Sequence, residues 1–184
     1  METAPDTDPA YAQRIATLGR ELGIPADYAA RRGLALQPEA VEVVSIGPSP
    51  EGRDVQLIPG AAAAWHGLNT AAAQANIVLL PISGFRSVDR QAEIIRDKRA
   101  AGIPLDEILR LVAAPGYSEH HTGRALDLGT PDELALEESF ALTAAYRWLM
   151  IHACGFGFTL TYPRGNPHGI AFEPWHWCWR SISA

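Results

Sequence analysis

The sequence predicts an α+β domain, in which helices pack against one face of a small antiparallel sheet and a cleft lies on the other face. Short apolar runs of strand length alternate with segments of helical periodicity, and stretches rich in glycine and proline separate them. In the last run, Trp175, Trp177 and Trp179 alternate with His176 and Cys178, which predicts an aromatic face for the core and a polar face for the cleft. The length of 184 residues is that of one domain.

The composition is typical of a globular protein and argues against some partners. The hydrophobic fraction is 47% and the charged fraction is 20%, which provides enough apolar residues for a core. The formal charge of −6 argues against non-specific nucleic-acid binding and against an anionic membrane surface. No run approaches the roughly 18 apolar residues of a membrane-spanning helix. No pattern indicates an oligomeric state.

The N-terminus lacks the pattern of a signal peptide. Residues 1–9 are acidic and polar, without a basic region followed by an apolar run. The chain as it stands is therefore expected in the cytoplasm, and a removed leader would instead place it in the periplasm or outside the cell. The two cysteines, Cys154 and Cys178, do not make a disulfide framework, and whether they pair stays open.

The first 55 residues are expected to form an accessory segment that packs on a main domain of residues 56–184. Apolar residues recur at helical spacing over residues 10–22, and a second short helix is expected over 25–32. Two strand-like runs, 41–46 and 54–58, flank a turn rich in glycine and proline, which predicts a hairpin.

The main domain is expected to alternate helices and strands. The expected helices cover residues 60–75, 87–100, 104–112 and 137–152, and the expected strands cover 77–83, 124–128, 155–160 and 170–179. Ser87 is suited to cap the helix that follows it, because its hydroxyl can accept a backbone N–H of the first turn. Arg86 then lies at a strand-to-helix junction, where functional residues are often found.

The stretch from Ser118 to Asp127 carries donor groups for a metal. His120 and Asp127 are separated by Gly123, which can turn the chain with a positive φ. The residues after the glycine alternate as a short strand, so Ala125 and Asp127 share a face, and the small alanine leaves room for a metal and a substrate. The turn is expected to bring His120 back to Asp127.

A second stretch, Glu173-Pro174-Trp175-His176, adds another imidazole and a further carboxylate. Proline interrupts a sheet ladder, so this segment is expected at an edge, a bulge or a strand end, where both side chains can turn into one cleft. Two histidines and one carboxylate with an open fourth position are the donors of a catalytic zinc site. Either pair alone is weak evidence, and the hypothesis depends on the two pairs together.

These motifs resemble those of the zinc D-alanyl-D-alanine carboxypeptidases and dipeptidases of the VanY and VanX type. The family pattern Ser-x-His-x-x-Gly-x-Ala-x-Asp is matched by Ser118, His120, Gly123, Ala125 and Asp127. The pattern Glu-x-Trp-His is matched by Glu173, Trp175 and His176. Two further family segments correspond to residues 83–87 with Gln91, where Phe85 replaces a tyrosine, and to residues 162–165. The resemblance covers roughly residues 78–180 and implies a fold of the hedgehog and D,D-peptidase type.

The resemblance implies a role for each matched residue. The implied zinc ligands are His120, Asp127 and His176. The implied catalytic residues are Glu173, as general base, and Arg86, which would polarise the scissile carbonyl. The residues expected to contact the substrate are Ser118, Gln91 and Ser87.

The implied function is removal of a C-terminal D-alanine from peptidoglycan stem peptides by metal-activated water. Alternatives within the enzyme class are an L,D-carboxypeptidase of wall-peptide recycling, a D,D-dipeptidase and an endopeptidase of a phage lysis system. A zinc-bearing binding module is an alternative of another class, although such a module is expected to lose Glu173 or Arg86. A purely structural zinc site would need a fourth protein ligand, for which His121 or Cys178 is available.

Overall fold

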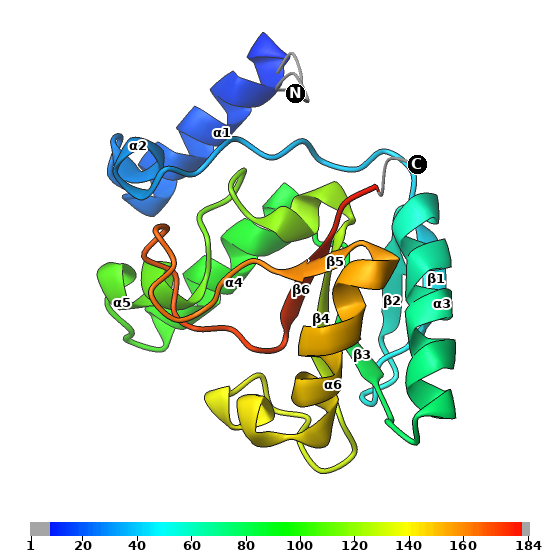
Figure 1. The fold of residues 1–184 in the computed structure, drawn as a ribbon. Coiled ribbons are helices and arrows are strands. Elements are labelled where there is room, and N and C mark those ends of the chain that lie inside the picture. Colours follow the sequence, from blue (N-terminus) through cyan, green and yellow to red (C-terminus); the bar gives the residue numbers. More distant parts are fainter. Residues whose placement is uncertain (1–7, 182–184) are drawn as a thin grey trace.

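A four-stranded antiparallel sheet lies at the centre of the fold in the computed structural model, which describes residues 8–181 (Figure 1). Its strands, in spatial order, are β3 (Leu80–Ser83), β4 (Ala125–Gly129), β6 (His176–Trp179) and β5 (Phe158–Leu160). A separate antiparallel hairpin consists of β1 (Val44–Pro48) and β2 (Asp54–Leu57). The predicted α+β class is confirmed.

Helices surround this sheet. The α-helices are α1 (Pro9–Leu22), α2 (Tyr28–Arg32), α3 (Pro59–Gln74), α4 (Val88–Ala100), α5 (Leu105–Leu111) and α6 (Ala144–His152). Short 3₁₀ helices are η1 (Glu119–Thr122), η2 (Glu138–Leu142) and η3 (Ala153–Phe156). No helix in the described part of the chain is both long enough and apolar enough to span a bilayer.

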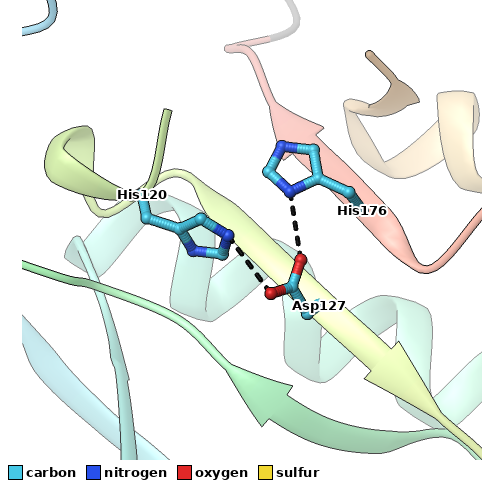
Figure 2. Close-up of side chains that lie close together, drawn as sticks. All are labelled: His120, Asp127 and His176. Atoms are coloured by element: carbon cyan, nitrogen blue, oxygen red, sulfur yellow. Dashed lines mark hydrogen bonds and ion pairs between the residues drawn. The ribbon is translucent and has the colours of Figure 1, made fainter. Parts of the chain in front are cut away.

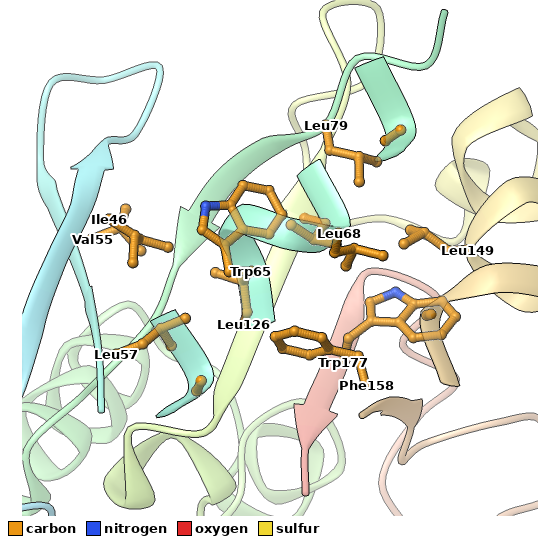
Figure 3. Close-up of a cluster of buried hydrophobic side chains, with 14 of the residues drawn as sticks. Ile46, Val55, Leu57, Trp65, Leu68, Leu79, Leu126, Leu149, Phe158 and Trp177 are labelled. Carbon is orange, nitrogen blue, oxygen red and sulfur yellow. The ribbon is translucent and has the colours of Figure 1, made fainter. Parts of the chain in front are cut away.

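The main core lies between one face of the sheet and the helices α3 and α6 (Figure 3). Trp65 and Leu149 from these helices pack with Leu126 of β4 and Trp177 of β6, and all four are at most 2% exposed. Successive side chains of a strand point to opposite faces. Burial of Leu126 and Trp177 therefore turns the intervening polar side chains of β4 and β6 to the opposite face, as the alternation in the sequence predicted. Trp175, also predicted on the core face, lies in the turn before β6, packs at the edge of the core and lines the cleft as well.

A second apolar cluster joins the N-terminal helices to α4 and α5. Leu22 and Tyr28 pack there against Ile95 and Ile108. The Tyr28 hydroxyl also accepts the backbone N–H of Ala114, 3.2 Å away. The N-terminal segment therefore contacts the helices beside the cleft.

Arg32 connects the same segment to a distant loop. Its Nη1 atom donates to the carbonyl oxygens of Leu109, His168 and Gly169 at 2.8, 3.3 and 3.0 Å. The division into residues 1–55 and 56–184 stays a prediction, and its boundary falls inside β2. Residues 1–7 and 182–184, at the outer ends of the two predicted parts, lie outside the described residues.

The predicted long helix over residues 137–152 is wrong. Residues Glu138–Leu142 form η2, and the chain is then extended at Thr143, with φ −74° and ψ 159°. The Thr143 hydroxyl accepts the N–H of Tyr146 at 3.0 Å and so caps α6 as a new helix.

Several predicted strands are shorter than expected or displaced. The last strand begins at His176 rather than residue 170, because Pro174 and Trp175 form a turn. β5 begins only at Phe158, after Gly157 ends η3 with a φ of 84°. β3 begins at Leu80 rather than residue 77, and β1 covers 44–48 rather than 41–46. The other predicted elements end within about three residues of the observed ones, and both Cys154 and Cys178 are free.

Candidate metal centre

The polar face of the sheet brings three donor side chains together (Figure 2). Asp127 of β4 lies opposite His176 of β6 in the antiparallel register, and His120 extends from η1, just before β4. The closest approaches are 3.2 Å from His120 Nε2 to Asp127 Oδ2 and 3.0 Å from His176 Nδ1 to Asp127 Oδ1. Donor atoms of the three buried residues all lie within 4.8 Å of one another, so the residues predicted as zinc ligands form one cluster.

Two glycines allow His120 to take this position. Gly123 ends η1 in the left-handed conformation, with a φ of 63°, which the sequence predicted. Gly84 lies so close to β2 that a Cβ atom there would collide with the Gln56 carbonyl oxygen. The Gly84 carbonyl accepts Nδ1–H of His120 at 2.7 Å, which leaves Nε2 directed at Asp127.

The Nε2 atom of His176 is also held by a hydrogen bond. His176 Nε2 lies 3.0 Å from Glu119 Oε2, so this nitrogen donates to the carboxylate and Nδ1 is left for a metal. Metal-binding histidines commonly hold their other ring nitrogen to a carbonyl or a carboxylate in this way. The inward atoms of His120, His176 and Asp127 are donor types that zinc takes. The residues therefore fit a zinc ion with three protein ligands.

The two carboxylates of this cluster are stabilised in the charged form. Burial alone would raise the pKa of Asp127, but its ion pairs and hydrogen bonds with His120 and His176 hold that pKa well below the usual range. Burial also opposes the charged form of Glu119, but its hydrogen bond and charge interaction with His176, together with hydrogen bonds to Thr161 and Cys178, outweigh this effect and lower the pKa. The site therefore offers negative charge to a divalent cation.

Glu173 and Arg86 line the same cleft, which has a volume of about 330 Å³. The Glu173 carboxylate lies 3.9 Å from His176 Nδ1, and Arg86 Nη2 lies 3.9 Å from Asp127 Oδ2. Glu173 is only 9% exposed, and this burial, with the neighbouring charge of Asp127, raises its pKa to about 7. Both predicted catalytic side chains thus border the metal cluster.

Arg86 is held in place on its far side. Its Nη1 donates to Gln91 Oε1 at 3.0 Å, and its Nη2 donates to Ser83 Oγ at 3.1 Å. The Gln91 amide in turn donates to the Ala113 carbonyl at 2.6 Å. Both ends of the Gln91 amide are therefore used within the protein, and Gln91 acts on the site by fixing the guanidinium.

The predicted substrate-binding residues differ in position. Ser118 lines the cleft and is 5% exposed. Ser87 instead caps α4, where its hydroxyl accepts the N–H of Arg90 at 3.1 Å, and it is not among the residues that line the cleft. Gln91 lines the cleft with its amide engaged as described. Substrate contact by these three residues stays a prediction.

Glu119 and His121 have functions that the sequence analysis missed. His121 is fully buried; its Nδ1–H donates to the Arg86 carbonyl at 2.7 Å, and its Nε2 accepts the N–H of Gly116 at 3.0 Å. With both nitrogens engaged, His121 supplies no fourth ligand. Among residues 8–181, neither it nor Cys178 belongs to the metal-capable cluster. In the sequence, only proximity to His120 marks Glu119 and His121, because His176 lies 57 positions from Glu119 and Arg86 lies 35 positions from His121.

Replacement of Glu119 by glutamine is expected to weaken zinc binding about 10-fold or more, because it removes the charge that orients His176. Competition with a chromogenic chelator measures this affinity. Glu138→Gln is a matched control, since Glu138 is exposed and pairs with Arg164 at the surface. Equal affinities of the Glu119→Gln protein and the wild type would show that this carboxylate does not support the ligand.

Comparison with known proteins identifies the family. The sequence profile of the VanY family, described as D-alanyl-D-alanine carboxypeptidase, matches residues 54–182. The chain belongs to this family. The resemblance found in the motifs is thereby confirmed.

Individual relatives agree with this assignment. YodJ of Bacillus subtilis (strain 168) is 36% identical over 110 residues, which are 58% of this chain and 40% of YodJ, so the chain spans about two fifths of that relative. The solved structure of the LdcB LD-carboxypeptidase has a TM-score of 0.68 and 29% identity, over 77% of this chain and 69% of that chain.

Another solved structure concerns the metal directly. A mutant of the D,D-pentapeptidase VanY from a VanB-type resistance cassette, in complex with Zn(II), has a TM-score of 0.58 and 26% identity, over 76% of this chain and 78% of that chain. This zinc complex of a related protein and the chain's own His-Asp-His cluster together support zinc as the metal of the site.

Proposed function

We propose that the protein removes the C-terminal D-alanine from peptidoglycan stem peptides. The main support for this proposal is that Glu173 and Arg86 line the same cleft as the His-Asp-His cluster. When bound by His120, Asp127 and His176, zinc would act as a Lewis acid and lower the pKa of water. The described residues contribute no fourth ligand to the cluster, which supports a catalytic site over a structural one.

Glu173 is proposed as the general base. It lies beside the ligand His176 without belonging to the ligand cluster. A carboxylate whose pKa is about 7 can take a proton from water and return it to the leaving amine near neutral pH. The same group thus serves both halves of the hydrolysis.

Arg86 is proposed to stabilise the oxyanion that forms from the scissile carbonyl. Its guanidinium is fixed by Gln91 and Ser83 before substrate arrives, so little reorganisation is needed in the transition state. Ser118 at the buried end of the cleft is proposed to donate to the terminal carboxylate of the peptide. A binding module is expected to lose Glu173 or Arg86, and both are present here, which favours an enzyme over a binding module.

An L,D-carboxypeptidase is the second candidate. The LdcB LD-carboxypeptidase has a TM-score of 0.68 with this chain, against 0.58 for the zinc-bound D,D-pentapeptidase. The family description, D-alanyl-D-alanine carboxypeptidase, favours the D,D activity that we propose first. The two activities differ in the stereochemistry of the residue before the cleaved bond.

Mass spectrometry of the products tests the proposal. Zinc-loaded protein is incubated separately with a pentapeptide stem, a tetrapeptide stem and D-Ala-D-Ala, each with and without a chelator. Chelator-sensitive loss of one alanine from the pentapeptide is expected. Loss only from the tetrapeptide would establish the L,D activity instead, and cleavage of only the free dipeptide would establish a dipeptidase. No cleavage of the three peptides would overturn the proposed function.

A further inference from the structure

The cleft extends beyond the metal centre along one side of α4. Gln91, Ile94 and Lys98 recur at spacings of three and four residues, which places them on one side of the helix, and all three line the cleft. Gln91 marks the inner end, where it holds Arg86. A helix rises about 1.5 Å per residue, so Lys98 lies about 10 Å farther along the cleft than Gln91.

The two ends of the cleft differ in exposure. At the inner end, Ser118, His120 and His176 are at most 5% exposed. Leu111 and Leu136, which line the same cleft, are 50% and 37% exposed. A carboxypeptidase takes the end of its peptide into the buried part. The preceding residues of the peptide then leave through the exposed part, past α4.

Lys98 supplies a positive charge along this exit. Its side chain is half-buried, and no carboxylate of residues 8–181 lies within ion-pair distance of its ammonium group. Of the arginines on α4, Arg90 pairs with Glu93 and Arg96 pairs with Glu21, whereas Arg99 donates to the Leu22 carbonyl. Apart from the metal cluster and its neighbours, the cleft lining includes several apolar side chains: Ile94, Leu111, Val112, Leu136 and Ile170. A cation in such surroundings, beside the path of the substrate, favours a carboxylate as its partner.

Stem peptides carry a free carboxylate at a matching distance. Their second residue is a glutamate joined through its γ-carboxyl group, so its α-carboxylate remains free. In an extended pentapeptide, the longer γ-link of about 6 Å and one further residue of about 3.8 Å place this group about 11 Å from the carbonyl of the last bond. This length is close to the rise of about 10 Å along α4 between Gln91, which holds Arg86, and Lys98.

We infer that Lys98 binds the α-carboxylate of the γ-linked D-glutamate and makes the enzyme selective for stem peptides with an acid, rather than an amide, at the second position. This inference rests on the proposed function and adds a specificity-determining residue to it. Lys98 acts on substrate selection and leaves the bond-cleaving groups unchanged.

Two pentapeptides that differ only at the second residue, γ-linked D-glutamate or D-isoglutamine, test this inference. Wild-type protein is expected to cleave the acid with a kcat/KM about 5-fold above that for the amide, as is typical of a partly exposed charge pair. Lys98→Met removes the charge, and we expect it to abolish this preference by lowering kcat/KM for the acid. Lys98→Arg is expected to retain it. Arg96→Met, which removes a charge from α4 away from the cleft lining, is the matched control.

Equilibrium binding of the same two peptides to zinc-loaded Glu173→Gln protein separates this inference from the proposed function. A preference for the acid that Lys98→Met removes would support the inference even without turnover, whereas absence of turnover in the wild type would contradict the proposed function alone. Equal binding of acid and amide by a protein that cleaves both would overturn the inference. An unchanged preference for the acid in Lys98→Met would overturn the inference as well. A further pair of peptides carries diaminopimelate or lysine at the third residue, and selectivity governed by that residue would also overturn the inference.

Discussion

Glutamine in place of Glu173 is expected to lower kcat by about 10²–10⁴ while zinc remains bound. The amide keeps the size of the side chain, but it cannot accept the proton of water. Glu173 lies outside the His-Asp-His cluster, so the ligands are intact in this variant. The loss should therefore fall on kcat, with little change in the metal content.

Turnover of the pentapeptide and zinc content by atomic absorption measure these two effects on one sample. Glu107→Gln is the matched control, because Glu107 is an exposed residue of α5. Wild-type turnover in Glu173→Gln would contradict the role of general base. Loss of zinc together with activity would instead show that Glu173 is needed as a ligand.

Lysine in place of Arg86 is expected to lower kcat by about 10²–10³, the loss typical for removal of one oxyanion donor. The guanidinium donates to Gln91 and Ser83 with nitrogens 3.0 and 3.1 Å away, and its planar fork sets the orientation of the remaining N–H groups. An ammonium group is a point charge on a flexible stem and does not reproduce this arrangement. Conservation of charge alone should therefore not rescue the enzyme.

Steady-state kinetics on the pentapeptide separate kcat from KM in this variant. Arg90→Lys is the matched control, because Arg90 lies four residues farther on and pairs with Glu93 at the surface. If kcat of Arg86→Lys stayed within about 2-fold of the wild type, a positive charge alone would suffice for the reaction, and the planar fork of the guanidinium would have no role in it. A change in KM alone would assign Arg86 to ground-state binding.

The clustering of the three proposed metal ligands was predictable because the relevant geometry is local. Gly123 permits the turn after His120, and the alternation of side chains in a strand fixes the face of Asp127. The same alternation separates Trp177, which enters the core, from His176, which faces the cleft. Such features need only a few neighbouring residues, and the motif spacing records them directly.

The support of the site was not predictable in the same way, because it depends on contacts between distant segments. Glu119 meets His176 across 57 positions, and Arg32 meets the carbonyl of His168 across 136. No periodicity in the sequence encodes such pairs. The helix break at Thr143 was missed for a different reason: the apolar residues on either side continue a helical pattern, and one hydroxyl cap outweighs it.

Anomalous scattering at the zinc edge, from crystals of the zinc-loaded protein, locates the metal directly. We expect one strong peak within about 2.3 Å of His120 Nε2, His176 Nδ1 and an Asp127 carboxylate oxygen, with a non-protein fourth ligand. A peak bound by a fourth protein atom would indicate a closed structural site. A peak away from these three side chains would contradict the assignment of the metal centre.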